Sequence, residues 1–395
     1  MSKIDELIAE FCPDGVEYRQ LGSCVLNNIG GGTPSRSVER YWRGDIPWAS
    51  VGDINASGIT MGFPRQSISS EGLASSSSKV VPAGWVVVAV KIAPGAMRVV
   101  SAPFAINQDI RGLQLAPILD PHFLTYYFKT ISIVSNGTIV QGITSKRLEG
   151  VQIPLPPLEV QREIVSILDK FTQLEAELEA ELKARRSQYE HTRDQLLDFS
   201  GDLSSHPMRE LIAEFCPNGV GMKKLESLTK TVRAPRSIPR SQYLDSGILP
   251  VIDQSQLPIA GYVNELDVAL DIGACVVFGD HTREVKFVDY PFAAGADGTV
   301  ILSAAPAMLP RYLYFVMAAL RITSRGYNRH WSTVKNIEVP VPPLEVQREI
   351  VSILDKLDAL VNDITIGLPA EITARRKQYE HYRNTLLAFK ELETA

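Results

Sequence analysis

Apolar residues recur every three, four or seven positions along two long stretches of the chain, and each stretch follows a double proline. In the first stretch they are Ile164, Leu168, Phe171, Leu174, Leu178, Leu182, Tyr189 and Leu196. In the second they are Ile350, Leu354, Leu357, Val361, Ile364, Leu368, Ile372, Tyr379 and Leu386. This spacing places one apolar stripe along a helix, as in the seam of a coiled coil. We therefore predict two helices of about 60 Å that pack against each other.

Two irregularities interrupt this pattern. LEAELEAELKA, from Leu174 to Ala184, steps by four residues, which lengthens a helix while rotating its seam. In the second stretch, Gly367-Leu368-Pro369 predicts a break or kink, because proline removes a backbone donor and clashes with the preceding turn.

The two stretches belong to a tandem repeat. PPLEVQREIVSILDK occurs at Pro156–Lys170 and again, without a change, at Pro342–Lys356. Two further pairs are ELIAEFCPDGV with ELIAEFCPNGV and RRSQYEHTRDQLL with RRKQYEHYRNTLL. The period is far above that of stacked solenoid repeats, so the chain consists of two half-molecules. The two repeated helical stretches, here called the arms, predict an approximate two-fold axis. One kind of partner can then dock twice, once on each arm. The unlike segments ahead of the arms, here called the heads, can hold unlike ligands.

The segments ahead of each arm, Leu21–Leu155 and Leu225–Val341, have a different pattern. They combine turn residues with short β-prone runs and end in one apolar helix each. The predicted strand regions are Trp85–Ile92, Phe104–Leu115, Ala274–Phe278 and Val285–Val288, and the predicted helices are His122–Ile133 and Arg311–Ile322. The expected fold class is α+β, with two mixed α/β heads mounted on long helices.

Composition narrows the class of protein. Hydrophobic residues make up 45% and charged residues 22% of the 395 residues, as in ordinary globular domains. The longest apolar runs are shorter than the roughly 20 residues that a membrane span requires, and the N-terminus lacks a secretory-signal pattern. We expect a cytoplasmic protein without membrane contact. Its four cysteines include no C-x-x-C pair, so we expect reduced, buried thiols.

The net charge of −5 argues against a simple nucleic-acid binder, but the charge is distributed unevenly. Leu21–Leu155 contains eleven Lys and Arg against seven Asp and Glu, a balance of +4. Pro157–Ser200 contains six against ten, a balance of −4. The excess acid therefore lies in the repeated arm and not in the first head.

No group of residues predicts catalysis. NIGGGTPS, at Asn28–Ser35, lacks the lysine of a phosphate-binding P-loop, and the six histidines form no metal-binding motif. Asp280–Arg283 could supply an acid and a base, but no activated nucleophile lies nearby in the sequence, so a solvated or ligand-facing loop is the favoured interpretation. We expect a non-catalytic protein with no cofactor and no metal.

Loops in the two heads mix basic, amide and aromatic side chains, which are the types that contact phosphates and base edges. Each loop alone is more typical of a solvated surface, whereas the set favours nucleic acid. In the first head the candidates are Thr33, Ser35, Arg36, Tyr41, Trp42, Arg43, Asn107, Gln108, Lys146 and Arg147. In the second head they are Arg233, Arg236, Arg240, His281, Thr282, Arg283, Arg325, Tyr327, Asn328, Arg329, His330 and Trp331.

Several motifs together resemble one known family. They are PLPPLEVQREIVSILDK, the RR-x-QYE-x-x-R stretch, GGTPSR…YW-x-GDIPW (Gly31–Trp48), AINQDIRGL (Ala105–Leu113) and GDHTR-x-VKF (Gly279–Phe287). Over almost its whole length the chain resembles the specificity subunit of type I restriction-modification enzymes. The resemblance implies two target-recognition domains that read the halves of a split DNA sequence. It also implies an antiparallel coiled coil that spaces these domains and binds two methyltransferase subunits, with motor-nuclease subunits completing the complex.

On this interpretation residues 1–155 form the first target-recognition domain and 156–200 the central helix. Residues 201–341 form a linker with the second domain, and 342–395 the C-terminal helix. The residues expected to pack the helices are Ile164, Leu168, Phe171, Leu178, Leu182, Ile350, Leu354, Leu357, Val361 and Ile364. Two alternatives remain open at this point: a two-headed protein-interaction scaffold without nucleic acid, and a DNA-modifying enzyme.

Overall fold

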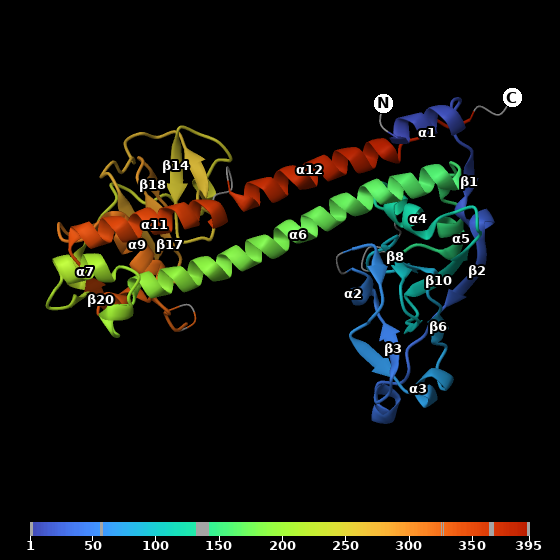
Figure 1. Cartoon of the computed structure of the whole chain (residues 1–395), viewed down its shortest axis with the longest axis horizontal. Helices are drawn as coiled ribbons and strands as arrows, with labels where there is room; N and C mark the ends of the chain where they lie inside the picture. Colours follow the sequence, from blue (N-terminus) through green and yellow to red (C-terminus); the bar gives the residue numbers. More distant parts are fainter. Residues whose placement is uncertain are drawn as a thin grey trace. The chain divides into compact units, whose positions relative to one another are not determined.

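The computed structural model describes residues 3–55, 58–131, 142–324, 326, 328–362 and 367–392. The chain divides into two compact units. Unit 1 contains residues 1–179 and 372–395, and unit 2 contains residues 180–371. Helix α6 (Leu158–Leu197) begins in unit 1 and ends in unit 2 (Figure 1). Within the described ranges, no helix combines the length and the apolar content that crossing a bilayer demands.

The head of unit 1 contains two sheets and a short ribbon. One sheet has the order β2-β10-β7-β8-β4 and the other β5-β3-β9-β6, while β1 pairs with β11. The strands of the first sheet are β2 (Val25–Gly30), β4 (Thr60–Met61), β7 (Val86–Ala89), β8 (Met97–Val100) and β10 (Ile110–Leu115). The remaining strands are β1 (Tyr18–Gln20), β3 (Ile46–Ala49), β5 (Gln66–Ile68), β6 (Lys79–Val81), β9 (Phe104–Ile106) and β11 (Gln152–Pro154). The helices are α1 (Lys3–Phe11), α2 (Val51–Ile54), α3 (Ser70–Ala74), α4 (Pro121–Phe128) and α5 (Ser145–Glu149).

The head of unit 2 repeats this strand order with an unlike sequence and with one strand fewer in each sheet, since β4 and β6 have no counterpart among its described residues. Its sheets have the orders β13-β19-β16-β17 and β15-β14-β18, and β12 pairs with β20. As in unit 1, the middle strand of the second sheet has one antiparallel and one parallel neighbour. The strands are β12 (Gly221–Lys224), β13 (Thr229–Val232), β14 (Leu249–Ile252), β15 (Gly261–Val263), β16 (Cys275–Gly279), β17 (Val285–Val288), β18 (Ala293–Ala294), β19 (Thr299–Ala304) and β20 (Glu338–Val341). The helices are α7 (Arg209–Phe215), α8 (Leu225–Leu228), α9 (Pro310–Ala319), α10 (Trp331–Val334), α11 (Leu344–Asn362) and α12 (Leu368–Leu386).

The predicted α+β class is confirmed, and several expected elements differ in their bounds. The predicted helix Arg311–Ile322 begins at Pro310 and ends at Ala319. The predicted helix His122–Ile133 begins at Pro121, where Asp120 caps its first turn, and ends at Phe128. The predicted strand region Phe104–Leu115 is divided by the turn at Asn107–Asp109, so that β9 and β10 lie in different sheets. Gly367 lies outside α11 and α12, as the Gly-Leu-Pro sequence predicted, and Ile364 falls outside the described residues.

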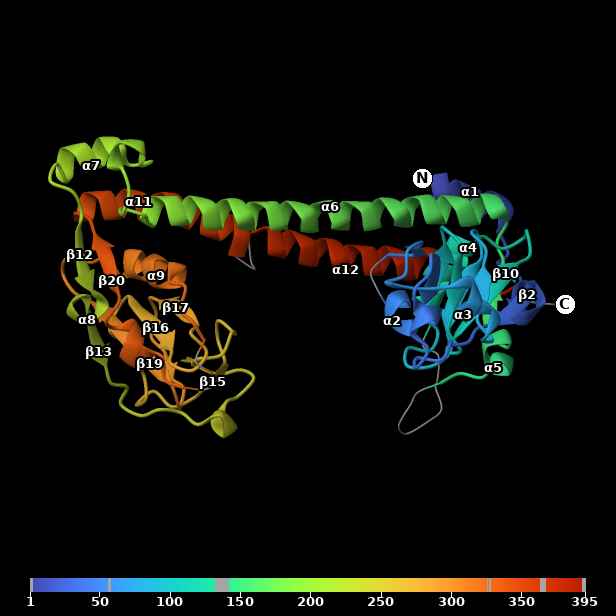
Figure 2. The ribbon, with the colours of Figure 1, turned by 90° about the horizontal axis from the view of Figure 1, so that it is seen from below.

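In each unit one head helix lies between a sheet and a long helix. In unit 1, α4 lies beneath α6 and above the five-stranded sheet, and Phe123 of α4 shares a core with Ile164 and Leu168 of α6 (Figure 2). In unit 2, α9 has the same position between β16 and α11, and Phe315 shares a core with Ile350 and Leu354. The first turns of the apolar stripe therefore bury their side chains against the heads.

A buried glutamine fastens each head to its long helix. The Gln161 carboxamide accepts a hydrogen bond from Asp120 N at 2.8 Å and donates to the carbonyls of Ile118 and Pro156 at 2.9 and 2.7 Å. Gln347 makes the same three bonds in unit 2, with Leu309 N and the carbonyls of Ala307 and Pro342. Both glutamines are fully buried. We name these two groups the glutamine clamps.

Further along the helices, the pairing within unit 1 is antiparallel. Phe171 of α6 stacks on Tyr382 of α12 at 5.3 Å between ring centroids, and it also contacts Tyr379. One turn later, Arg376 of α12 pairs with Glu175 at 2.6 Å and with Glu179. In unit 2, Leu182, Leu357 and Val361 belong to or pack against the same hydrophobic core. Leu178, at the end of the part of α6 that belongs to unit 1, is half-buried.

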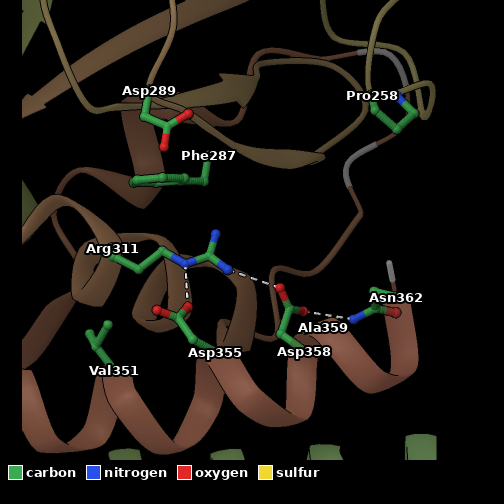
Figure 3. A pocket seen from close by; sticks show the side chains of 9 residues that line it. All are labelled: Pro258, Phe287, Asp289, Arg311, Val351, Asp355, Asp358, Ala359 and Asn362. Carbon is green, nitrogen blue, oxygen red and sulfur yellow. Dashed lines mark hydrogen bonds and ion pairs between the residues drawn. The ribbon is translucent and has the colours of Figure 1, made fainter. Parts of the chain in front are cut away.

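The identical arm sequence meets different head residues in the two units. In unit 1, Asp169 accepts a hydrogen bond from the Tyr126 hydroxyl at 2.7 Å. In unit 2 the equivalent Asp355 pairs with Arg311 at 2.6 Å, and Asp358 pairs with the same guanidinium at 3.0 Å (Figure 3). Arg311 also lies over the ring of Phe287 and lines a cavity of about 780 Å³ between the second head and α11. The head residues that contact this part of the arm therefore differ between the two units, while the arm sequence is the same.

The C-terminal segment of the described chain lies against the N-terminal segment. Val16 N donates to Lys390 O at 2.8 Å, and Leu392 N donates to Val16 O at 2.9 Å. The Tyr18 hydroxyl adds a hydrogen bond to Phe389 O. The described part of the C-terminal segment therefore lies beside Val16 and Tyr18.

This adjacency predicts that a circular permutant will fold. We expect a chain whose ends are joined by a short Gly/Ser linker, and which is reopened between Ser204 and Ser205, to keep its thermal stability within a few degrees. Both serines are exposed, and the hydrogen bonds that cross the cut are those of Ser205 with Asp202 O and of His206 N with Leu203 O. Circular dichroism melting checks the expectation. A permutant cut inside β7, where the strand is buried, is the control that should fail to fold.

Candidate nucleic-acid interface

In the first head, the segment from Gly31 to Trp42 folds around two tryptophans. The Trp48 indole donates to Gly32 O and the Trp42 indole to Ser35 O, both at 3.1 Å. The Arg36 guanidinium lies 4.2 Å from the centre of the Trp42 ring. Gly31 is required here because a Cβ atom would come within 2.1 Å of Ile106 O. Arg36 is therefore exposed, with its guanidinium packed over the ring of Trp42.

This segment is joined to a second candidate loop. The Thr33 hydroxyl donates to the Gln108 side chain at 2.5 Å, although the two residues lie far apart in the sequence. Asn107 is buried, and its carboxamide accepts a hydrogen bond from Asp109 N, so it shapes the turn. Asp109 in turn pairs with Lys91 at 3.2 Å. The structure therefore brings the loop of Thr33 and the loop of Gln108 together.

A cavity of about 650 Å³ extends this surface. Its walls are Val90, Ile92 and Ile143, and its polar rim comprises Lys91, Gln108, Asp109, Thr144 and Arg147. The cavity lies where hairpin β7–β8 meets the chain that leads into α5, because Ile143 N donates to Val90 O at 2.8 Å. We name the first loop cluster as the set Thr33, Ser35, Arg36, Trp42, Lys91, Ile92, Gln108 and Arg147.

In the second head, Asp280 organises the corresponding loops. Its carboxylate accepts a hydrogen bond from Trp331 N at 2.6 Å and lies 3.9 Å from Arg329. Its carbonyl accepts from His330 N at 2.9 Å, and the Arg283 guanidinium donates to Ile322 O at 2.8 Å. Two sets of candidate residues that the sequence separates, His281–Arg283 and Asn328–Trp331, therefore meet. With Gln254 they form the second loop cluster.

Hydrogen bonds around the buried Asp253 support the second loop cluster from beneath. Thr282 donates to Gln254 O at 2.6 Å, and Lys286 donates to the carbonyls of Asp253 and Leu257. Burial lowers the pKa of the Lys286 ammonium, which the nearby Asp253 carboxylate partly opposes. Burial, together with Asp253, raises the pKa of the Tyr243 hydroxyl to about 12. Tyr243 is therefore neutral at physiological pH and acts as a hydrogen-bond donor to Asp253 at 3.3 Å.

The two clusters occupy the same place in the two heads. Hairpins β7–β8 and β16–β17 are equivalent in strand order, and each packs against the chain between the head helix and the next short helix. The two hairpin ends are equivalent in position but not in sequence, which is VKIAPGA in the first head and DHTRE in the second. Each head consequently presents one composite loop surface with its own side chains.

The remaining candidates are not members of the two loop clusters, although some adjoin them in sequence. Tyr41 is half-buried beside Arg40, and Arg43 pairs with Glu39. Lys146 is exposed on α5, Arg233 is exposed, and Arg236 pairs with Glu265. Arg240 lies in a 3-10 helix with the same place in chain order as the 3-10 helix of Tyr41 and Trp42. Arg325 and Tyr327 fall outside the described residues.

Sequence reasoning missed Lys91, Ile92, Gln254 and both glutamine clamps. The exact repetition of Gln161 as Gln347 was the one available signal for the clamps. Among the residues that the structure describes, no group of three His, Cys, Asp or Glu side chains is placed to hold a metal ion. The chemistry of both loop clusters is that of hydrogen bonding and stacking.

Comparison with known proteins gives a consistent result. A family model described as the type I restriction modification DNA specificity domain matches residues 13–185 and 217–374. The chain is 30% identical over 381 residues to the type I restriction enzyme EcoprrI specificity subunit of Escherichia coli, covering 89% of this chain and 90% of that protein. It is also 30% identical over 273 residues to the EcoR124I/EcoR124II specificity subunit of Escherichia coli, covering 64% and 67%.

Solved structures show the same fold. The S subunit of a type I restriction-modification system from M. genitalium superposes with a TM-score of 0.59 over 94% of this chain and 96% of that chain, at 16% identity. A chain from a study of assembly and conformational transition of the type I R-M system gives a TM-score of 0.57 at 17% identity, over 95% and 98% of the two chains. The fold is thus shared over almost the whole chain.

Proposed function

Because the chain belongs to the family of type I restriction-modification specificity subunits, we propose that it selects the DNA sequence on which a methyltransferase and restriction complex acts. Residues 1–155 and 201–341 are the two target-recognition domains, and each reads one half of a split site through its loop cluster. Residues 156–200 and 342–395 are the arms that set the spacer. The proposed location is the cytoplasm.

The proposed partners are double-stranded DNA and two methyltransferase subunits, which dock on the repeated arm sequences. Motor-nuclease subunits complete the restriction complex. The subunit itself recognises the DNA target, and the methyltransferase and motor-nuclease subunits carry out catalysis. Two observations support this division most directly. The arms, including both glutamine clamps, are the same in the two halves. The loop clusters lie at equivalent places in the two heads but have different side chains.

Each loop cluster has the side chains that DNA recognition requires. Arginine pairs with guanine edges and glutamine with adenine edges, while aromatic rings hold such side chains in place. The second head carries eleven Lys and Arg against eleven Asp and Glu from Leu225 to Pro340, so it is neutral overall. Phosphate contacts supply much of the affinity of DNA-binding proteins, so we expect the isolated subunit to bind weakly and the methyltransferases to add phosphate contacts.

The two alternatives are less well supported. A protein-interaction scaffold without nucleic acid would bind with weak dependence on salt, whereas DNA binding driven by phosphate contacts weakens steeply as salt rises. A mobility-shift titration of the assembled complex between 50 and 200 mM salt separates these two cases. Catalysis by the purified subunit alone would favour a modifying enzyme.

The proposed function predicts that each head controls one half-site. We expect Arg36→Ala to weaken or relax recognition of one half-site and Arg329→Ala the other, each by about 1 to 3 kcal/mol. Methylation mapping in a host that expresses the complex reports both half-sites and the spacer. Arg19→Ala is the matched control, because Arg19 pairs with Glu17 away from the loop clusters. A wild-type complex that methylates no split sequence would contradict the proposal.

A further inference from the structure

Ile92 has a backbone conformation that isoleucine rarely adopts. Its φ angle is 69°, in the left-handed region, where a β-branched side chain crowds the neighbouring carbonyl. The residue stands at the end of hairpin β7–β8, and 64% of it is exposed to solvent. Such strain persists only where the surrounding structure enforces it, and it concentrates at functional sites.

The surroundings of Ile92 do enforce its conformation. Gly95 N donates to Ala89 O at 2.9 Å and Ala93 N donates to Lys91 O at 2.8 Å, which closes the hairpin end. On its other side, Lys91 pairs with Asp109, and Val90 O accepts from Ile143 N. The backbone on both sides of Ile92 is therefore held by hydrogen bonds and one ion pair.

The second head repeats this feature with a different side chain. At the end of the equivalent hairpin β16–β17, Arg283 has a φ angle of 68°. A residue with a positive φ angle therefore occurs in the hairpin turn of both heads, Ile92 in the turn at 90–96 and Arg283 in the turn at 280–284. A hairpin end that only had to turn would be served best by glycine. The Arg283 guanidinium donates to Ile322 O within the second head, whereas the Ile92 side chain is exposed, so at this hairpin end the first head offers its side chain to a ligand.

The side chains around Ile92 indicate which group of the DNA this residue contacts. Val90, Ile92 and Ile143 form the apolar wall of the cavity of about 650 Å³, and Lys91, Gln108 and Arg147 lie on its rim. The thymine methyl is the apolar group that base edges present in the major groove. An exposed isoleucine among hydrogen-bonding side chains fits that group, while the rim faces polar edges and phosphates.

We propose that Ile92 reads a thymine in the half-site of the first head by packing against its 5-methyl group. This inference rests on the proposed function and adds to it a residue and a base. It also assigns the hairpin end, and not only the loops found by sequence, to specificity.

The test uses the complete complex with its methyltransferase subunits and a duplex that carries the methylation-mapped site. Each thymine of the half-site altered by Arg36→Ala is replaced in turn by deoxyuridine, which removes only the methyl group. We expect one replacement to lower the affinity about fourfold, the effect of taking one methyl group out of water. The Ile92→Asn complex should bind both duplexes equally, and Ile92→Val should keep most of the difference.

The variants separate recognition from folding. Asparagine tolerates the left-handed conformation better than isoleucine, so Ile92→Asn should melt at the wild-type temperature or above it. Weaker binding with undiminished stability therefore supports reading by the side chain. If no thymine of that half-site responds to loss of its methyl group, or if the response persists in Ile92→Asn, the inference is wrong. The proposed function would stand in that case, because it depends on the split motif of the wild-type complex.

Discussion

Replacing Gln161 with methionine should lower the free energy of unfolding of unit 1 by about 2 to 4 kcal/mol. Methionine matches the length of glutamine but offers neither donor nor strong acceptor. The change therefore leaves Asp120 N and the carbonyls of Ile118 and Pro156 without their partner in a fully buried position. Unsatisfied buried groups of this kind cost more than the hydrogen bond itself contributes.

Gln347→Met offers a matched second measurement. It removes the same three hydrogen bonds from unit 2, so denaturant unfolding followed by hydrogen exchange should show lost protection in α9, whereas Gln161→Met affects α4. Gln195→Met, at an exposed position of α6, should change stability by less than about 0.5 kcal/mol. Equal protection of α4 in the wild type and in Gln161→Met would show that the clamp contributes no stability.

The arms could be predicted from the sequence because their information is local. Steps of three and four residues define a helix face without knowledge of its partner, and the double prolines mark where each helix starts. The same periodicity could not tell which partner a residue meets. Ile164 and Leu168 belong to the stripe, yet they are buried in the core of the first head, whereas Phe171 stacks on α12.

The loop clusters were predicted only in pieces because strand pairing assembles them. Thr33 meets Gln108, and Asp280 meets Trp331, only after residues far apart in the chain have been aligned in sheets. Composition indicates which residue types are expected in such loops, but the pairing register of the strands determines which of these residues lie on one surface. The likeness of the two heads was hidden for the same reason. The orders of the strands that both heads contain agree, while the sequences of these strands do not.

Deleting Leu174–Glu177 should shorten the spacer of the recognised DNA site and leave both half-sites unchanged. Four residues are removed from a helix that passes from one unit into the other, which shortens it by about 6 Å and turns it by about 40°. At about 3.4 Å per base pair, this corresponds to a spacer shorter by one or two base pairs. Because both loop clusters lie outside the deleted turn, the bases read by each head should stay the same.

The repeat within LEAELEAELKA supplies the control for that deletion. After the deletion, Glu179 takes the position of Glu175 beside Arg376, but Lys183 takes that of Glu179, so one ion pair is replaced by a repulsion. Duplicating Leu174–Glu177 keeps a glutamate at both positions and should lengthen the spacer by the same one or two base pairs. Exposed ion pairs contribute about 0 to 1 kcal/mol, so the duplication separates helix length from lost pairing. Methylation mapping of both variants measures the spacers directly, and unchanged spacing in both would refute the role of the arm as a ruler.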